Sequence, residues 1–281
     1  MTKRLFLFAG YDTSGIIDDS LVLYVRTLSK LGDVVLCMDS DCDKKQTQKL
    51  KQYVLHATAH RHGEYDFGSY KRAYLWSREH LELSKYDFVY LVNDSVYGPL
   101  FPLKPYLEKM ESSNTDAFGL VKNTKAEHPH IQSWFIGMRD TVFMSDWFDT
   151  FLSDVKKLES KGAITHTYEH GFTKNVVLHG GNWMCLYSAH NRDIYNKIKH
   201  YYSQKMPFMK KVAFTRHNGQ LGPQISYVLK HTGAPMRNAI LNNAKRVYGN
   251  EYVTHTLNQS RAMAFLHGTK YAIEKLISGT L

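Results

Sequence analysis

The sequence has few cysteines and no long apolar run, and both features narrow the class of protein. Only three of its 281 residues are cysteine (Cys37, Cys42 and Cys185), and no two of them form a CxxC pair. Such an odd, scattered set is no disulfide framework and is typical of a reducing cytosol. The segment RLFLFAG is too short for the hydrophobic region of a signal peptide, and no apolar run is long enough to span a bilayer. We therefore expect a soluble, cytoplasmic protein that contacts membranes only peripherally.

Four common motifs of nucleotide-binding and hydrolytic proteins are also missing. The chain has no Walker loop, no GxGxxG after its first predicted strand, no GxSxG elbow and no HExxH pair. The loop histidines His128 and His130 are weak candidates for metal ligands, because such close positions rarely converge without a cysteine or carboxylate partner.

Acidic residues are outnumbered by basic ones, which gives a formal net charge of +10. A basic surplus suggests anionic partners such as a phosphorylated substrate or an acidic membrane face. The charges are spread along the chain, and no RRM, KH or zinc-finger pattern is present, so we expect no nucleic-acid partner. The 43% of hydrophobic residues is enough for a sizeable core.

Strand-like and helix-like segments alternate in the first half of the chain. Apolar runs predict buried strands at residues 5–9, 34–38 and 88–92, a shorter one at 53–57, and helices from Asp18 or Asp19 and over 68–81. This alternation predicts an α/β fold with a mostly parallel central sheet flanked by helices and with its ligand at the carboxyl edge of the strands.

The second half of the chain alternates less regularly. Strands are predicted at residues 116–121 and 131–138, helices at 144–155, after Tyr168 and at 191–202, and short helical pieces beyond Gly222. No repeat or low-complexity linker interrupts the chain. We expect one domain with a helical C-terminal section.

Three short polar clusters each follow a predicted strand or begin a predicted helix. They are RHGEYDFGSYK at 61–71, NDS at 93–95 and HPHIQSWFIGMR at 128–139. Because the carboxyl ends of parallel strands share one edge of a sheet, we expect the three clusters to converge on one cleft.

Five blocks, in this order, resemble the rhamnan-synthesis F family of bacterial polysaccharide glycosyltransferases. They are RHGEYDFGSYKRA, YDFVYLVNDSVYGPL, HIQSWFIGMR, YEHGFTKNVVLHGG and MPFMKK, and the resemblance runs from about Arg4 to about Lys211. It implies a GT-A-like, Rossmann-like fold in a single glycosyltransferase domain over residues 1–281. Within it, residues 1–122 would bind the nucleotide-sugar, 123–235 would hold the acceptor and catalytic part, and 236–281 would form a helical tail.

The resemblance implies that a short acidic motif at the end of a central strand holds a divalent cation. Asp94, between Asn93 and Ser95, occupies that position. A carboxylate suits Mg²⁺ or Mn²⁺, which would neutralise the diphosphate of the donor. Most metal-dependent members of the fold have two acids (DxD), whereas this chain has one, so the metal is either loosely bound or replaced by cationic side chains. Alternatively, Asp94 caps the following turn.

Other donor contacts follow from the same resemblance. Tyr11 would stack on uracil or thymine, and Asp39 would accept from the base or the ribose, although Asp39 also fits an ordinary turn. Arg61 and Lys71 are candidates to neutralise phosphate, and Asp66 would accept from a hydroxyl or cap the following helix.

Gln132, Trp134 and Lys210 are further candidates for the predicted donor site, and a fourth residue, His62, departs from the family pattern. Gln132 and Trp134 would grip sugar hydroxyls and a sugar ring, or else pack within a strand in which alternation points only one of Trp134 and Phe135 inward. Lys210 would close over the diphosphate, or else lie in a solvated basic loop. The family's usual block has Asn where this chain has His62.

An inverting displacement also needs a base to take the proton of the acceptor hydroxyl. By resemblance this base is a carboxylate at a helix start, for which Glu169 fits best and Asp146 is second. A glutamate near a helix N-terminus is also common for dipole reasons alone.

These expectations together predict an inverting glycosyltransferase that uses a nucleotide-sugar donor. The family name implies L-rhamnose, carried by dTDP, as the first sugar to expect, or another hexose. The sugar would be added to a growing bacterial surface polysaccharide (O-antigen, capsule or cell-wall glycan). The acceptor would be polyprenyl-diphosphate-linked. The basic charge of the chain would then attract it to the anionic lipids at the cytoplasmic face of the inner membrane. The alternative is a non-catalytic nucleotide- or glycan-binding subunit of an assembly complex.

Overall fold

The computed structural model describes residues 2–125, 129–260, 262–266 and 269–270. The chain divides into two compact units, each described by itself. The first, here called the sheet unit, comprises Met1–Ile17, Leu21–Asp94 and Leu103–Asn191. The second, the helical unit, comprises Asp18–Ser20, Ser95–Pro102 and Arg192–Leu281. The functional division of a single domain at residues 122 and 235 stays a prediction.

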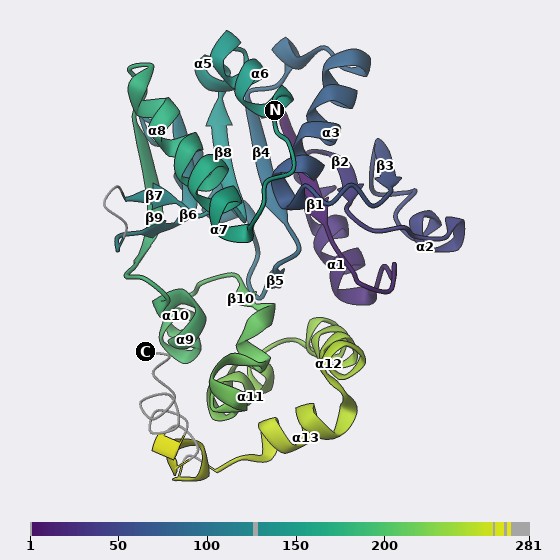
Figure 1. Ribbon diagram of the computed structural model, residues 1–281, viewed down its shortest axis with the longest axis vertical. Coiled ribbons are helices and arrows are strands. Elements are labelled where there is room, and N and C mark those ends of the chain that lie inside the picture. Colours follow the sequence, from purple (N-terminus) through teal and green to yellow (C-terminus); the bar gives the residue numbers. More distant parts are fainter. Residues whose placement is uncertain (1, 126–128, 261, 267–268, 271–281) are drawn as a thin grey trace. The chain divides into compact units, whose positions relative to one another are not determined.

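One eight-stranded sheet runs through the described part of the sheet unit, in the order β3-β2-β1-β4-β8-β6-β7, with β9 paired to β6 (Figure 1). The strands are β1 (Arg4–Gly10), β2 (Asp33–Met38), β3 (His56–Ala59), β4 (Phe88–Asn93), β6 (Ala117–Asn123), β7 (His130–Ile131), β8 (Phe135–Arg139) and β9 (Trp183–Ala189). Strands β3, β2, β1 and β4 pair in parallel, as do β6 and β9, whereas β8 and β7 run antiparallel to their neighbours. The predicted α/β fold with a mostly parallel central sheet is confirmed.

Helices cover the sheet. They are α1 (Asp19–Leu28), α2 (Lys44–Gln48), α3 (Tyr65–His80), η1 (Leu83–Lys85), α4 (Lys104–Glu111), α5 (Asp140–Phe143), α6 (Asp146–Ser153), α7 (Lys161–Ile164), η2 (Thr165–His170) and α8 (Gly171–Leu178). Helix α3 packs along β1 and β2 (Figure 1). Since every residue of β1 is buried, both of its faces must be covered, as parallel strands require.

The apolar run of β1 supplies two different packing surfaces, because successive side chains of a strand point to opposite faces. Leu5 and Leu7 belong to the core cluster that also contains Tyr70 of α3. Phe6 and Phe8 face the other way: the ring of Phe6 stacks on Tyr90 at 5.1 Å between centroids, and Phe8 meets Tyr24 of α1 edge-on at 5.2 Å. Burial on both faces fixes the strand whose end carries Tyr11.

Three features of the eight-stranded sheet differ from the sequence-based expectation. The strand expected at 131–138 is divided into β7 and β8 by a turn in which the amide of Gln132 donates to Val121. The strand expected at 53–57 is β3, shifted to His56–Ala59, and β9 was not predicted at all. Much of β9 is only half-buried, which explains why it lacks a continuous apolar run.

The helical unit contains a two-stranded sheet and several helices. The strands are β5 (Val96–Tyr97) and β10 (Met209–Lys210), and the helices are α9 (Asp193–Asn196), α10 (Ile198–Ser203), η3 (Lys211–Phe214), η4 (Arg216–Gly219), α11 (Gly222–Lys230), α12 (Ala234–Tyr248) and α13 (Asn250–Asn258). The predicted helical C-terminal section is confirmed for the described residues, and residues 271–281 of the predicted tail lie outside them. No helix in the described ranges is both long and apolar enough to cross a membrane.

Candidate functional site

The carboxyl ends of β1, β2 and β4 lie side by side, and backbone hydrogen bonds continue past them. Ala9 is in register with Asn93, and Gly10 with Met38. The amide of Asp39 donates to the carbonyl of Gly10 at 2.9 Å, and the amide of Asp94 to that of Ala9 at 3.1 Å. The polar residues that follow these strands therefore share one edge of the sheet, as the parallel pattern predicted.

Asp94 is buried at this edge and holds the loop that follows β1. Its Oδ1 accepts a hydrogen bond from the amide of Tyr11 at 3.2 Å. This partner precedes Asp94 in the chain by 83 residues. The alternative that Asp94 caps the following turn stays a prediction. Its role as a metal ligand stays a prediction.

Asp39 fastens the loop in front of α3. Its Oδ1 accepts from the amides of His62 and Gly63, both at 2.8 Å, and Gly63 has a φ of +72°, which suits glycine. Burial alone would raise the pKa of Asp39, but the hydrogen bonds from Gly63 and His62 outweigh it and hold the pKa below its ordinary value. Asp39 is therefore an ionised anchor of this loop.

Tyr11 and Arg61 form an accessible pair beside the two anchored loops. The Tyr11 side chain is 44% exposed, and the Arg61 guanidinium lies 5.8 Å from the centroid of its ring. The amide of Arg61 donates to Asp41 at 3.0 Å, which fixes its backbone. An aromatic face next to a guanidinium can accept a nucleobase by stacking and a phosphate by charge.

Asp66 connects α3 to the end of β4. Its Oδ2 accepts from Nδ2 of the buried Asn93 at 2.8 Å. The N-cap of α3 is Glu64, and Asp66 lies in the first turn, so the expectation that Asp66 caps the helix is wrong. The capping position moved because α3 begins at Tyr65, three residues earlier than predicted.

Glu169 lies in η2, a π-helical turn between α7 and α8. Such turns widen the backbone ring and are frequent at functional sites. Its Oε1 is 3.2 Å from Nε2 of His130, and its Oε2 accepts from the amide of Ser133 at 3.3 Å and from the Ser133 hydroxyl. The turn thus brings Glu169 to the loop between β7 and β8, as expected if the YEHG and HIQSW blocks share a site.

Tyr70 joins the polar clusters through the interior, and sequence reasoning did not single it out. Its hydroxyl donates to the carbonyl of Ser133 at 3.0 Å and also hydrogen-bonds with the Asn93 side chain. Complete burial, and then the charge of Asp66, raise the pKa of Tyr70. One signal was available: Tyr70 is four residues after Asp66, so both lie on one helix face.

Gln132 and Trp134 are buried against each other. Nε1 of Trp134 donates to Oε1 of Gln132 at 2.7 Å, and Trp134 is 3% exposed. Phe135 is buried too, so the expectation that only one of Trp134 and Phe135 faces inward is wrong. Alternation does not apply to Trp134 because it precedes β8 and lies in the turn. Sugar contacts by this pair stay a prediction.

Of two other candidates, Asp146 begins α6 and Lys71 contacts the segment that follows this helix. Nζ of Lys71 donates to the carbonyl of Val155 at 2.6 Å and is 4.0 Å from the Glu64 carboxylate. Asp146, the second choice for the base, begins α6 after β8 has returned antiparallel to the amino end of β4 (Figure 1). The structure therefore places Asp146 away from the edge that carries Asp94.

Ser95 and Lys210 belong to the helical unit. Strand β10 pairs with β5, and Nζ of Lys210 donates to Oγ of Ser95 at 2.9 Å. The same Nζ lies 5.5 Å from the ring centroid of Tyr195. Lys210 is buried, so the alternative of a solvated basic loop is wrong for this residue.

The donor set at Asp94 fits only a cation that is held largely by its substrate. Within the ranges that the structure describes, no three or more His, Cys, Asp or Glu side chains are grouped so as to hold a metal ion. Asp94 supplies one carboxylate, which is sufficient for Mg²⁺ or Mn²⁺ when phosphate oxygens and water complete the coordination. Of the two candidate histidines, His128 lies outside the described residues, and His130, in β7 rather than in a loop, contacts Glu169.

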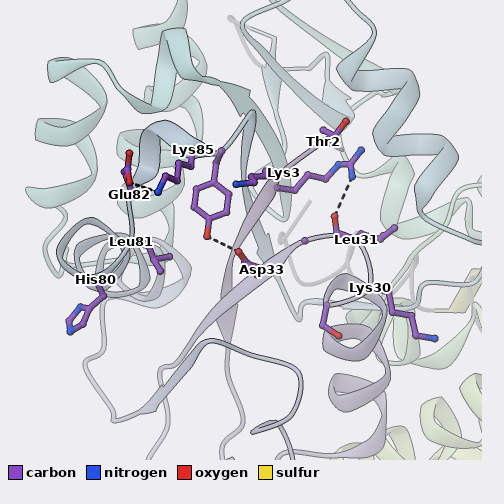
Figure 2. A pocket seen from close by; sticks show the side chains of 13 residues that line it. Thr2, Lys3, Lys30, Leu31, Asp33, His80, Leu81, Glu82 and Lys85 are labelled. Atoms are coloured by element: carbon purple, nitrogen blue, oxygen red, sulfur yellow. Dashed lines mark hydrogen bonds and ion pairs between the residues drawn. The ribbon is translucent and has the colours of Figure 1, made fainter.

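A cavity of about 530 Å³ lies at the opposite, amino-terminal edge of the sheet (Figure 2). Two pairs of its polar groups contact each other: the Tyr86 hydroxyl donates to Asp33 at 2.7 Å, and Lys85 lies 2.6 Å from Glu82. It contains none of the predicted site residues. Ligands of open α/β sheets bind at the carboxyl ends of the strands, so this cavity is not the candidate site.

Comparisons with known proteins were informative at the level of family. The family model described as rhamnan synthesis protein F matches residues 34–275. A curated relative, the uncharacterized protein y4gN of Sinorhizobium fredii, is 24% identical over 181 residues, which cover 63% of this chain and 47% of that protein. The chain thus spans about half the length of the curated relative that it matches.

Solved structures show weaker similarity. A protein considered to be a nucleotide-diphospho-sugar transferase, from Desulfovibrio desulfuricans G20, is 14% identical with a TM-score of 0.43, covering 90% of this chain and 99% of that one. The mannosyltransferase Ktr4p of S. cerevisiae is 11% identical with a TM-score of 0.35, covering 60% and 62%. Identities and TM-scores this low say nothing of the substrate of this chain.

Proposed function

Because the chain belongs to the rhamnan synthesis protein F family, as its five sequence blocks indicated, we propose that it is a nucleotide-sugar-dependent glycosyltransferase. One observation carries the proposal: the Tyr11–Arg61 pair and Asp94 share an edge of the sheet, and a buried hydrogen-bonded chain connects that edge to Glu169. A donor-binding surface and a carboxylate base are the two parts that sugar transfer needs.

The donor would lie across the ends of β1, β2 and β4. Tyr11 stacks on the base, Arg61 and Lys71 neutralise phosphate, and Asp39 and Asp66 accept from hydroxyls. Asp94, flanked by Asn93, holds Mg²⁺ or Mn²⁺, which when bound neutralises the negative charge of the diphosphate. The expectation that Lys210, in the helical unit, closes over the diphosphate stays a prediction.

Glu169 would act on the acceptor. It accepts the proton of the acceptor hydroxyl while the hydroxyl oxygen bonds to the anomeric carbon and the bond from that carbon to the diphosphate breaks. The displacement inverts the anomeric configuration. Its partially exposed carboxylate supports this role, because a base must reach the proton that it takes.

The family name supports a bacterial surface polysaccharide as product, with L-rhamnose or another hexose as the transferred sugar. We further propose a polyprenyl-diphosphate-linked acceptor at the cytoplasmic face of the inner membrane, because the chain carries a net charge of +10 and anionic lipid attracts basic surfaces.

A second candidate function is a non-catalytic nucleotide- or glycan-binding subunit. The single carboxylate at the end of β4 favours it, since catalytic metal sites of this kind usually have two. The two candidates differ in turnover: a binding subunit would bind nucleotide and release no sugar from a donor.

Binding of nucleotide tests the donor site. We expect UDP, GDP, dTDP or CMP to raise the melting temperature by mass action on the folded state, and to raise it further with Mn²⁺ or Mg²⁺. Equal shifts with and without metal would mean that cationic side chains alone serve the site. No shift with any of the four, at concentrations up to the millimolar range, would contradict the donor site altogether.

A further inference from the structure

Three hydrogen bonds hold both oxygens of Glu169 in place. Oε1 contacts Nε2 of His130, and Oε2 accepts from the amide and the hydroxyl of Ser133. The His130 side chain is 2% exposed, whereas that of Glu169 is 20% exposed. Since His130 is enclosed, of these two side chains it is Glu169 that can meet a substrate from solvent.

The loop between β7 and β8, which carries Ser133, is itself fixed by further hydrogen bonds. The Tyr70 hydroxyl donates to the carbonyl of Ser133 at 3.0 Å and hydrogen-bonds with Asn93, the residue before Asp94. On the other side, the amide of Ile131 donates to Oγ1 of Thr173 at 3.1 Å, which ties β7 to the helix that continues from η2. The loop between β7 and β8 is thus fixed both to the end of β4 and to α8.

We propose that His130, Ser133 and Tyr70 are positioning residues that hold Glu169 at a fixed distance from the donor-binding end of β4. The inference rests on the proposed function, in which Glu169 is the base. A glutamate has several rotatable bonds, and fixing them in advance removes an ordering cost from the chemical step. Donated hydrogen bonds also favour the ionised carboxylate, which is the form that accepts a proton.

Direct contacts are tested by His130→Leu and Ser133→Ala, with His130→Gln as a conservative variant whose amide can still donate to Glu169. We expect His130→Leu and Ser133→Ala to lower kcat about tenfold to a hundredfold with little change in KM for the donor, because misplacing a catalytic group by about 1 Å has effects of this size. His130→Gln should keep most of the activity.

The hydrogen bond from Tyr70 to Ser133 is tested by Tyr70→Phe, which removes only a hydroxyl. Tyr90→Phe is its matched control: Tyr90 is also fully buried, but its hydroxyl donates to Glu111 at 2.7 Å, on the helix α4. Tyr70→Phe should lower kcat several-fold, whereas Tyr90→Phe should leave kcat within about twofold, since the Tyr90 hydroxyl pairs with Glu111 and Arg4 rather than with Ser133 or Asn93. Equal kcat in both variants would contradict the role of Tyr70.

The pH dependence separates positioning from mere folding. The acid limb of the kcat profile should move to higher pH by about one unit in His130→Leu, because a hydrogen bond donated to the carboxylate is lost. Besides His130, the titratable groups near the carboxylate include Tyr70 and His170, whose ring lies 4.0 Å from that of His130. A purely structural role would lower stability and leave the limb unchanged.

A readout without turnover keeps the inference separate from the proposed function. In protein labelled with ¹³C at glutamate carboxyls, the Glu169 signal is assigned by its loss in Glu169→Gln. Its titration midpoint should move to higher pH in His130→Leu and Ser133→Ala and stay unchanged in Tyr90→Phe. Unchanged midpoints in both of the first two variants would overturn the inference even if the wild type transfers sugar. Shifted midpoints in a protein that turns over no donor would support the held carboxylate and refute the proposed function.

Discussion

Substitution of Asp94 by asparagine and by alanine separates the two tasks that this side chain combines. Oδ1 accepts from the amide of Tyr11, and the negative charge is proposed to hold a cation. Asparagine keeps a carbonyl oxygen at the same position but carries no charge, whereas alanine removes both. The two variants should therefore differ in stability and agree in their loss of transfer.

The size of each effect follows from the contact. At 3.2 Å, the hydrogen bond from Tyr11 is long, so losing it in Asp94→Ala should lower the free energy of unfolding by about 1–2 kcal/mol. For a chain of this length, that corresponds to a melting temperature lower by about 2–4 °C per kcal/mol. Asp94→Asn should change stability by less than about 0.5 kcal/mol. Both should lower the transfer rate at least about a hundredfold, or 2.7 kcal/mol of barrier.

Two assays on the same preparations measure these effects: urea unfolding for stability and release of nucleoside diphosphate for transfer. A stable Asp94→Asn with near-normal transfer would refute the metal-binding role and leave Asp94 as a residue that fastens the Tyr11 loop. An Asp94→Asn as unstable as Asp94→Ala would show that the Tyr11 contact depends on charge, contrary to the reasoning.

Two further predictions concern the loops around the strand ends. Tyr11→Ala should weaken nucleotide binding by about tenfold with an unchanged melting temperature, since stacking on an exposed ring contributes about 1–3 kcal/mol per base. Titration calorimetry measures the Kd for the nucleotide, and an unchanged Kd would show that Tyr11 is not part of the site. Burial and the charge of Arg72 lower the pKa of His62, although the charges of Asp39 and Glu64 act in the opposite direction. On acidification, His62 is therefore protonated in the unfolded chain before it is protonated in the folded protein. The free energy of unfolding should fall as the pH drops below about 6.5. His62→Asn should lose less stability than the wild type between pH 7 and pH 5 in urea unfolding, and parallel curves would contradict the burial of a neutral His62.

The sheet edge was predictable from the sequence because its determinants are local. A continuous apolar run such as that of β1 marks a buried strand, and parallel strands place the residues that follow them at one edge. Tyr11, Asp39 and Asp94 could therefore be expected together before any coordinates were known. The partners of these residues could not be predicted, because the amides that donate to Asp39 and Asp94 belong to loops distant in the sequence.

The surroundings of Glu169 depended on long-range structure. A π-helical turn leaves no periodicity that distinguishes it from an α-helix over six residues. The turn at Ser133 interrupts a run that reads as one strand, and its carbonyl is held by Tyr70, 63 residues earlier. The sequence does not show that α3 begins before Asp66, at Tyr65, so it favours a helix cap at Asp66 over the observed contact with Asn93.

Turnover of nucleotide-sugars tests the central claim most directly. Wild-type protein incubated with dTDP-L-rhamnose and with other nucleotide-hexoses, in the presence of Mg²⁺ or Mn²⁺ and a polyprenyl-diphosphate-linked glycan, should release nucleoside diphosphate and extend the glycan. Glu169→Gln should bind nucleotide as tightly as the wild type but turn over about a hundredfold more slowly, because its amide cannot accept the proton. Asp146→Asn, at the opposite edge of the sheet, should behave as the wild type. Nucleotide binding without release of sugar from any donor, or full activity in Glu169→Gln, would contradict the account.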